Sequence, residues 1–550
     1  MSALLADRRL PWLVLAACLA AFAALVLTLQ AQLGFAFDEW DFLLGRRSLD
    51  ADSFLAPHHE HIAISHVAIY TALADAFGIG SPLPFQVVST LMLAGAAALV
   101  FAFLSRRVAW PVALAGVLPL LVLGPAAESV IWPFQLAFSG SIAAGMGALL
   151  ALERGDRVGD LLACALLVVA LSFSSLGIPF AVGVAVHVAL SPRWRARLWI
   201  ALVPIAAFGI WWLGWGRDAE SFLSFKNVAN SPGFIIDGLA SSIASLVGLG
   251  SEGSAGASAL DLGRPLLLIA LAAAALRLRR LGSVPPGVWV AGAIAISFWL
   301  LAALNANGLR LPTTGRYQLI GALFVLLVAA ELLRGVRISR AGLAAVLAIA
   351  VLAVAGNLEI LRQNWVAFRA QTEYQRGAVS AVEIARDRIE PDFVVDFPGG
   401  ATLFGDAALY LNAADELGSP AYDPGELAVA SEPARGAADA VLAQALGLGA
   451  RPAVDRARRP GCEPLEPDEL GAAVAELRPG VNLVSFGGSA SGPVKLRVRR
   501  FAAEFSVDLG AVPAQRAAAI EIPEDRAAEP WELQITGIES ATLCTGRRPT

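Results

Sequence analysis

Charged residues are scarce in this 550-residue sequence: they make up 16% of it, whereas hydrophobic residues make up 57%. An average soluble domain is closer to a quarter charged. Lysine is nearly absent, with only Lys226 and Lys495 among 41 basic residues, so arginine would have to bind any phosphate or carboxylate. Four cysteines are too few for a disulfide scaffold or a zinc cluster. These shortages exclude a soluble protein, a disordered chain and a nucleic-acid binder built on basic patches. They leave a polytopic membrane protein.

The few charges are divided unevenly along the chain. Residues 358–550 contain 28 acidic and 19 basic side chains, a net charge of −9, whereas residues 1–357 have a net charge of +4. We therefore predict a transmembrane domain at 1–357 and a C-terminal domain at 358–550, which is long enough to bury its own core. Residues 362–390 are expected to be helical. From about residue 480, short apolar runs between Gly and Pro predict a β-sandwich or jelly roll.

The apolar part contains eleven stretches that we expect to cross the membrane, which takes about 20 residues of helix. They lie at roughly 10–32, 84–104, 110–126, 134–152, 160–174, 177–190, 198–216, 264–281, 286–304, 318–334 and 341–357. Arginine clusters follow alternate spans and fall on the cytoplasmic side if the N-terminus is cytoplasmic. We therefore expect a multi-pass protein of the cytoplasmic (inner) membrane with an extracytoplasmic C-terminal domain.

This topology places four loops on the outer side: 34–83, 127–133, 217–263 and 305–317. Two further stretches within them, 61–78 and 233–250, are expected to form helices lying along the membrane surface. Cys462 and Cys544 could pair in this oxidising compartment.

Three acidic residues follow the first span: Asp38, Glu39 and Asp41. Asp38 and Asp41 would share one face of a helix, because they are three residues apart. Crowding and partial burial raise the pKa of a carboxyl group, so one of the three is a candidate general base toward an acceptor hydroxyl. The alternative is that they are solvated loop charges beside Trp40, a tryptophan at the membrane interface.

Four of the five histidines lie within nine residues, in the run Pro57-His58-His59-Glu60-His61 and at His66. Hydrogen bonding to a sugar or a phosphate would suit this cluster. Histidine and glutamate also bind divalent cations, although the spacing matches no zinc motif. A non-catalytic cap at the membrane interface is the third interpretation.

The second and fourth outer loops carry further candidates. Glu128, Trp132 and Gln135 lie at the outer end of the third span, where an acid is costly unless it faces a cavity or the interface. The late loop contains Arg310 and, at the start of the tenth span, Arg316 and Tyr317. A guanidinium binds phosphate through two parallel hydrogen bonds, so Arg316 suits a lipid-linked phosphate. The alternatives are a solvated Glu128 with Trp132 at the interface, and an Arg316 that reaches ordinary lipid headgroups.

The order of these motifs resembles the GT-C superfamily of integral-membrane glycosyltransferases, which use polyprenyl-phosphate-linked sugars, and especially its uncharacterised actinobacterial members. An acid after the first span, a second acid after the third and an Arg-Tyr pair at a late span support the resemblance. It implies that Asp38, Glu39 or Asp41 is the base, that Glu128 is the second acid and that Arg316 binds the donor phosphate. His58, His59, Glu60, His61, Trp132, Gln135 and Tyr317 are expected to contact substrate.

The expected reaction inverts the anomeric carbon on the outer side of the membrane, in the assembly of a cell-envelope glycan. The expected partners are a polyprenyl-phosphate sugar, membrane lipids and an acceptor that is a glycan, a lipid or a protein, with no nucleic acid. No cofactor is required, although a divalent cation could take part. Three alternatives stay open at this point: a transporter or flippase of lipid-linked saccharides, an O-antigen-type polymerase or ligase, and a non-enzymatic envelope scaffold.

Overall fold

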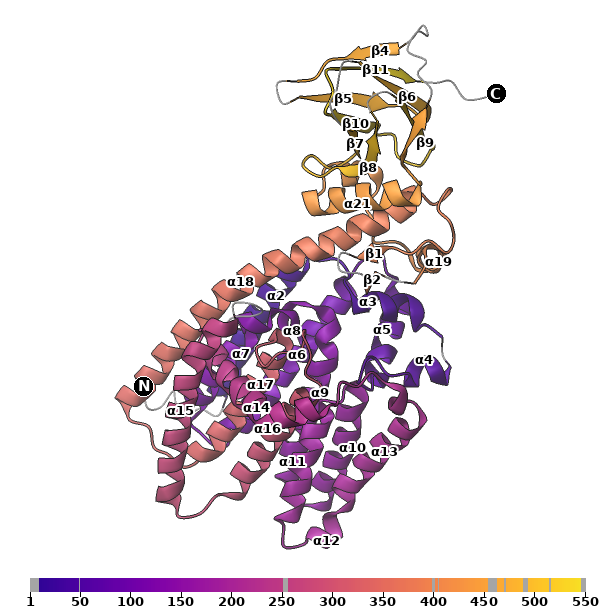
Figure 1. Cartoon of the computed structure of the whole chain (residues 1–550). Helices are drawn as coiled ribbons and strands as arrows, with labels where there is room; N and C mark the ends of the chain where they lie inside the picture. Colours follow the sequence, from indigo (N-terminus) through magenta and orange to yellow (C-terminus); the bar gives the residue numbers. More distant parts are fainter. Residues whose placement is uncertain are drawn as a thin grey trace. The chain divides into compact units, whose positions relative to one another are not determined.

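The computed structural model describes residues 9–48, 50–250, 256–397, 401–403, 405–453, 462–468, 471–487, 493–513 and 516–545. The chain divides into two compact units, here named the membrane unit and the C-terminal unit (Figure 1). The membrane unit comprises residues 1–32, 46–73 and 83–367. The C-terminal unit comprises 33–45, 74–82 and 368–550, and it therefore includes the acidic segment that follows the first span.

The membrane unit is built from helices. They are α2 (Leu10–Gln30), α4 (Ala51–Leu55), most of α5 (Ile64–Phe77), α6 (Leu83–Ser105), α7 (Trp110–Leu121), η2 (Gly124–Ala126), α8 (Ala127–Ile131), η3 (Pro133–Gln135), α9 (Leu136–Leu152), α10 (Arg157–Phe173), α11 (Gly177–Ala189), α12 (Trp194–Arg197), α13 (Trp199–Gly214), η4 (Gly216–Asp218), α14 (Phe225–Leu246), α15 (Gly256–Leu281), α16 (Pro286–Leu304), α17 (Gly315–Leu333) and the first half of α18 (Arg340–Ile384). Because α18 is continuous, the last predicted span and the predicted helix at 362–390 form one helix of 45 residues.

Eight helices among the described residues are long and apolar enough to cross a membrane. They are α2, α6, η3 with α9, α12 with α13, α15, α16, α17 and α18. A ninth crossing results if α7 and the segment Gly124–Ile131, which meet at a bend of 47°, are taken as one span. The predicted fifth and sixth spans are α10 and α11, helices of only 17 and 13 residues. The prediction of a multi-pass helical membrane protein is confirmed, while the count of eleven crossings stays a prediction.

Arginine side chains tie helix ends together at one end of the membrane unit. Arg107, after α6, forms an ion pair with Glu331 of α17 and another with Glu153, at 2.8 Å. Arg277 of α15 donates hydrogen bonds to the carbonyls of Leu332 (2.9 Å) and Arg334 (3.0 Å). These contacts bring several of the predicted cytoplasmic arginine clusters to the same end of the helices.

The C-terminal unit contains a β-sandwich preceded by short helices. Its elements are α3 (Asp38–Trp40), the π-helix η1 (Asp41–Gly45), β1 (Asp396–Phe397), β2 (Ala401–Thr402), α19 (Ala407–Leu417), α20 (Pro424–Ala428), α21 (Glu432–Ala445), β3 (Ala450–Ala453), β4 (Cys462–Leu465), β5 (Ala472–Leu477), β6 (Gly480–Gly487), β7 (Val494–Arg499), β8 (Val507–Val512), β9 (Ala517–Ile522), β10 (Trp531–Thr536) and β11 (Ser540–Thr545). Strands β3 to β11 form two antiparallel sheets, in the orders β5-β10-β7-β8 and β3-β9-β6-β11-β4. The predicted β-rich C-terminal domain is therefore confirmed.

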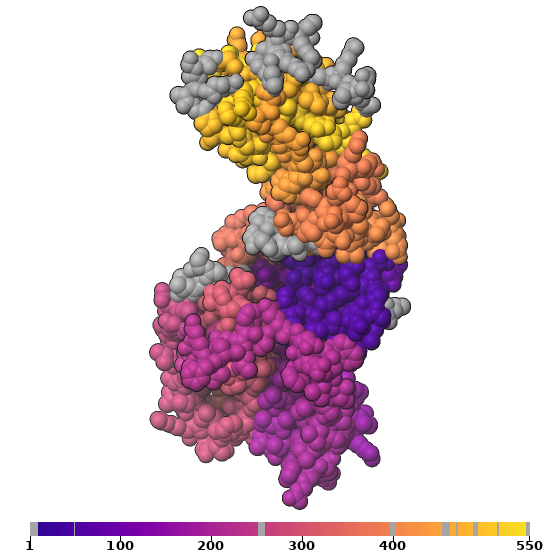
Figure 2. Space-filling view, turned by 45° about the vertical axis from the view of Figure 1, so that its right-hand side comes forward, coloured from indigo at the N-terminus to yellow at the C-terminus, as the bar shows by residue number. Residues whose placement is uncertain are grey.

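Alternating apolar residues explain why these segments form a sandwich. In β7, Val494, Leu496 and Val498 are fully buried, whereas the two basic residues between them are exposed. This period of two places one face of the sheet in the core. Cys462 of β4 and Cys544 of β11 form a disulfide bond, as the sequence suggested. In the space-filling view the described residues of this part are coloured orange to yellow (Figure 2).

Candidate functional site

The histidine run of the first outer loop forms a tight turn in the membrane unit. The backbone N–H of His58 donates to the carbonyl of His61, and the N–H of His61 donates to the carbonyl of His58, both at 2.9 Å. His59 between them has φ of 50°, in the left-handed region that non-glycine residues rarely adopt. Arg46 holds the start of the turn by donating to the carbonyls of Ala56 (3.1 Å) and Pro57 (2.9 Å). Backbone strain that is held by surrounding contacts is typical of functional sites.

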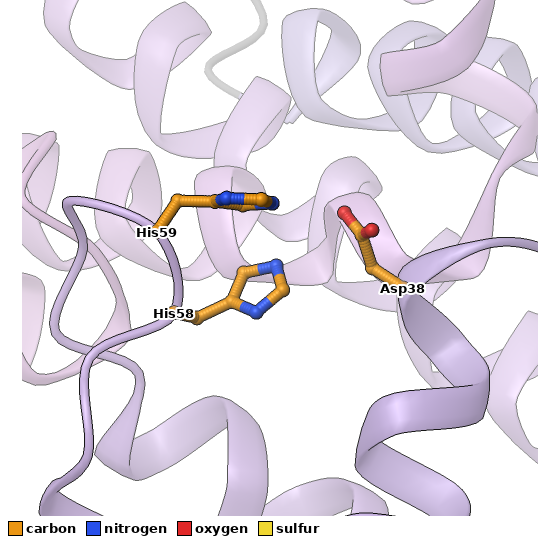
Figure 3. Close-up of side chains that lie close together, drawn as sticks. All are labelled: Asp38, His58 and His59. Carbon is orange, nitrogen blue, oxygen red and sulfur yellow. The ribbon is translucent and has the colours of Figure 1, made fainter. Parts of the chain in front are cut away.

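Aromatic contacts join this turn to the second outer loop. The rings of His58 and His59 lie 4.6 Å apart (Figure 3). The ring of Phe134 lies 5.3 Å from His58 and 4.4 Å from His66. Trp132 stacks on the other side of this group, with its ring 5.2 Å from that of Phe134. The structure therefore brings together two motifs that lie some seventy residues apart in the sequence.

Glu128, Trp132 and Gln135 lie where the third span is broken. Glu128 is in α8, the short helix after the bend, and its side chain is half-buried. Trp132 and Gln135 are buried, each 6% exposed. Trp132 is therefore not the exposed interfacial tryptophan of the simpler interpretation, because packing against Phe134 removes it from the surface. The catalytic role of Glu128 stays a prediction.

Charged side chains surround Glu60 in the same turn. The Glu60 carboxylate lies 2.7 Å from Nη1 of Arg310 and 3.5 Å from Nε2 of His61. Arg310 is also 3.9 Å from Glu220, whose carboxylate lies 3.6 Å from Nδ1 of His59. The first and fourth outer loops thus meet in a network of charges, and the loop after η4 contributes Glu220.

Burial sets the protonation of His61 in this network. It lowers the pKa of His61 to about 4, against an opposing effect of the Glu60 carboxylate, so the imidazole is neutral at pH 7. Burial by itself would raise the pKa of Glu60, but its electrostatic interactions with His61 and Arg310 outweigh burial and lower this pKa. Because His61 is neutral, Arg310 is the cation that balances the Glu60 carboxylate at pH 7. Nδ1 of His61 and Oε2 of Glu60 are buried without a hydrogen-bond partner.

Hydrogen bonds anchor the fourth outer loop on both sides of Arg310. Nδ2 of Asn227 in α14 donates to the carbonyls of Leu304 (3.1 Å) and Ala306 (3.0 Å). The hydroxyl of Thr314 accepts a hydrogen bond from the N–H of Leu311 at 2.8 Å, just before α17 begins. Arg310 therefore points its guanidinium at Glu60, with its side chain 10% exposed.

Arg316 differs from Arg310 in having no counter-charge. Nε of Arg316 is buried without a hydrogen-bond partner, and no carboxylate lies within ion-pair distance among the residues that the structure describes. Its charge nevertheless acts on the same cluster, because it contributes to lowering the pKa of His61. The next residue, Tyr317, packs its ring 6.0 Å from Phe298 and 6.2 Å from Trp299. A half-buried cation without a partner is costly, so an anion is the natural ligand at this position.

The acidic segment belongs to the C-terminal unit, where Gln375 of α18 holds it. Oε1 of Gln375 accepts hydrogen bonds from the N–H of Phe37 (2.8 Å) and from Nε1 of Trp40 (3.2 Å). Phe37 has φ of 51°, so the residue before Asp38 also has a positive φ that non-glycine residues rarely adopt. Trp40 is 1% exposed, so it is a buried anchor of the segment and not a tryptophan at the membrane interface.

The three carboxylates have different environments. Glu39 is fully buried, and its Oε2 accepts a hydrogen bond from the N–H of Ala36 at 2.9 Å. Asp41 is exposed and begins the π-helix η1. Asp38, also drawn in Figure 3, is half-buried at the start of α3. The Glu39 carboxylate is hydrogen-bonded to the backbone and Asp41 is exposed, so Asp38 is the best candidate for the general base.

Three residues of these sites were not predicted: Arg310, Glu220 and Gln375. Arg310 was visible as an arginine close to Arg316, but only the structure shows that Glu60 neutralises it. Glu220 and Gln375 carry no local signal, because each meets its partners only through the fold.

No family model matches the chain. No curated protein matches it either. Among solved structures, the chain is similar to the crystal structure of ArnT from Cupriavidus metallidurans bound to undecaprenyl phosphate. The two are 13% identical with a TM-score of 0.45, and the aligned part covers 75% of this chain and 85% of that one.

Proposed function

We propose that the protein is an integral-membrane glycosyltransferase of the GT-C superfamily, which moves a sugar from a polyprenyl-phosphate-linked donor to an acceptor hydroxyl. The single observation that carries the proposal is the Arg316 guanidinium, which has no carboxylate partner among the described residues and whose charge acts on His61 next to the Glu60–Arg310 pair. It lies in the first turn of α17, at the positive end of the helix dipole. Both features suit the phosphate of a lipid-linked donor. Arg310, the other arginine of the loop, is already neutralised by Glu60.

Arg316 would bind the donor phosphate and stabilise its charge as the sugar departs. In the reaction, the acceptor oxygen attacks the anomeric carbon on the face opposite the phosphate. The bond between that carbon and the phosphate oxygen breaks, and polyprenyl phosphate leaves with the bonding electrons. Asp38 takes the proton of the acceptor hydroxyl. The attack from the opposite face inverts the anomeric carbon.

The histidine turn would contact the sugar. His61 is neutral at pH 7, so it can donate and accept hydrogen bonds without adding charge to the site. His58 and His59 present two further rings at the same turn. Together with Glu220 they also offer ligand atoms of the kinds that hold a divalent cation, and we propose no step that depends on one.

We infer that the site faces the outer side of the cytoplasmic membrane. The arginine clusters that mark the cytoplasmic side are tied together at one end of the helices, through Arg107 and Arg277. The histidine turn and the fourth outer loop come from segments that connect the opposite helix ends. The acceptor would then be a component of the cell envelope, and the C-terminal unit would be extracytoplasmic.

Replacing the acidic residues one at a time tests the assignment of the base. We expect Asp38→Asn to lower the transfer rate about 10²–10⁴-fold, the usual contribution of a general base. Asp41→Asn is the matched control, because Asp41 is exposed in the same segment, and it should retain the parental rate. Parental transfer by folded Asp38→Asn would remove Asp38 from the mechanism.

A further inference from the structure

A solvent-open pocket of about 350 Å³ lies within the C-terminal unit. Three segments line it: the C-terminal turn of α18, the loop from the end of α19 to the start of α20, and the segment between β9 and β10. Its volume falls in the range of about 300–1,000 Å³ that is usual for small-molecule sites. The mechanism proposed above uses none of its residues.

The charged side chains in the pocket balance one another. Glu383, Asp423, Arg386 and Arg526 line it, two acids and two bases. Arg386 is ion-paired with Glu383, at 2.7 Å, and with Asp415. Arg526 is ion-paired with Asp387 at 2.8 Å. A ligand with a net charge would therefore compete with pairs that already exist, whereas a neutral ligand would not.

The remaining lining groups favour a ligand rich in hydroxyl groups. Carboxylates accept hydrogen bonds and guanidinium groups donate them, so the pocket can bind both the hydrogen and the lone pairs of a hydroxyl. Ser419 adds a hydroxyl, and Tyr422 adds an aromatic ring. The apolar lining residues are Ile384, Ala414, Ala421 and Pro424, which are mostly small and offer little to a bulky apolar ligand.

The wall that carries Ser419 and Tyr422 is fixed before any ligand arrives. Arg376 stacks its guanidinium 3.7 Å from the ring centre of Tyr422 and donates to the carbonyl of Pro420 at 2.6 Å. The N–H of Tyr422 donates to the hydroxyl of Ser380 at 2.8 Å. Asp423 caps α20 and forms a capping box with Glu426. Because these bonds already order the loop, binding loses little conformational entropy.

We propose that this pocket binds a neutral saccharide. The source of this saccharide rests on the proposed function: in a glycosyltransferase of the cell envelope, it is part of the acceptor. Binding of this saccharide to the pocket requires neither a donor nor catalysis.

The test measures saccharide binding by the full chain in lipid nanodiscs, without any donor, by saturation-transfer NMR. The probes are neutral gluco-, manno-, galacto- and arabino-oligosaccharides of two to four units, with oligogalacturonate as the anionic comparison. We expect at least one neutral probe to bind, and Tyr422→Ala and Arg526→Ala to weaken it about tenfold or more. Arg362→Ala is the matched control, because Arg362 forms a similar exposed ion pair with Glu359 outside the pocket, and it should change nothing.

Glu383→Gln provides a second test if either variant unfolds, since it keeps the shape of the side chain and removes one charge. It should also weaken binding. Arg316→Ala should bind the same saccharide normally, which separates failure of the pocket from failure of the transfer site. The proposal is overturned if no neutral probe binds, if only oligogalacturonate binds, or if the pocket variants bind as tightly as the parent.

Discussion

Arg316→Ala is the substitution for which the structure gives the clearest expectation. The guanidinium has no carboxylate partner among the described residues and lies beside the neutral His61. A hydrogen bond to a charged group contributes about 1.5–3 kcal/mol, and each 1.4 kcal/mol corresponds to a tenfold change in affinity. We therefore expect Arg316→Ala to bind a polyprenyl-phosphate sugar about 10- to 100-fold more weakly. The donor affinity of Arg316→Lys should lie between those of the parent and Arg316→Ala, because lysine keeps the charge and loses the two parallel hydrogen-bond donors of the guanidinium.

The stability of the same variant distinguishes a binding role from a structural one. Removing a half-buried charge that has no partner should leave the melting temperature unchanged or raise it. Arg310→Ala should lower the melting temperature, because it leaves Glu60 without its counter-charge. The assay is donor binding by microscale thermophoresis in nanodiscs, together with thermal unfolding of each variant. Unchanged donor affinity in Arg316→Ala, or a large loss of its stability, would refute the reasoning.

Three further predictions concern stability. Glu60→Gln removes the nearer carboxylate partner of the buried Arg310 guanidinium and leaves it with Glu220, 3.9 Å away. It should lower the free energy of unfolding by on the order of 3 kcal/mol, measured by chemical denaturation. His61 has its pKa lowered from 6.5 to about 4, so the unfolded chain binds more protons between these values, and stability should fall as the pH drops through this window. The free energy of unfolding should fall by about 1–2 kcal/mol over this window, a value reduced for solvent screening because the His61 side chain is 32% exposed. His61→Gln should abolish this pH-dependent loss. The same pH profile of stability in His61→Gln and the parent would contradict the lowered pKa of His61. Replacing Cys462 and Cys544 with alanine opens a loop of 82 residues and should destabilise the β-sandwich by about 2–4 kcal/mol, whereas an equal melting temperature with and without reductant would argue against it.

The broad features of the fold followed from the sequence because they depend on local patterns. Long apolar runs indicate membrane helices, and the alternation in segments such as Val494–Arg499 indicates strands. The strands expected after residue 480 are present, but the sandwich already begins with β3 at Ala450. Two of the three earlier strands, Ala450–Ala453 and Cys462–Leu465, were missed because each contains a proline and only four residues. Such edge strands carry a weak signal.

The candidate site could be predicted only in part. The histidine run and the late arginines stood out by composition, and the structure brings Glu60, His61 and Arg310 into one network with the charge of Arg316 close by. The different states of Arg310 and Arg316 could not be predicted, because they depend on the fold: Arg310 meets Glu60, 250 residues away in the chain, whereas Arg316 meets no carboxylate among the described residues. The same applies to Gln375, which shapes the segment around Asp38 from a helix 335 residues away.

Sugar transfer from a defined lipid-linked donor tests the central claim most directly. The purified parent and the Arg316→Ala variant would each be incubated in liposomes with a panel of polyprenyl-phosphate sugars and a cell-envelope extract as acceptor, with and without divalent cations. We expect the parent to release polyprenyl phosphate from at least one donor and form a glycosylated product with inverted configuration, and the variant to do so at a strongly reduced rate. A folded parent that consumes no donor in the panel, or a variant as active as the parent, would contradict the account.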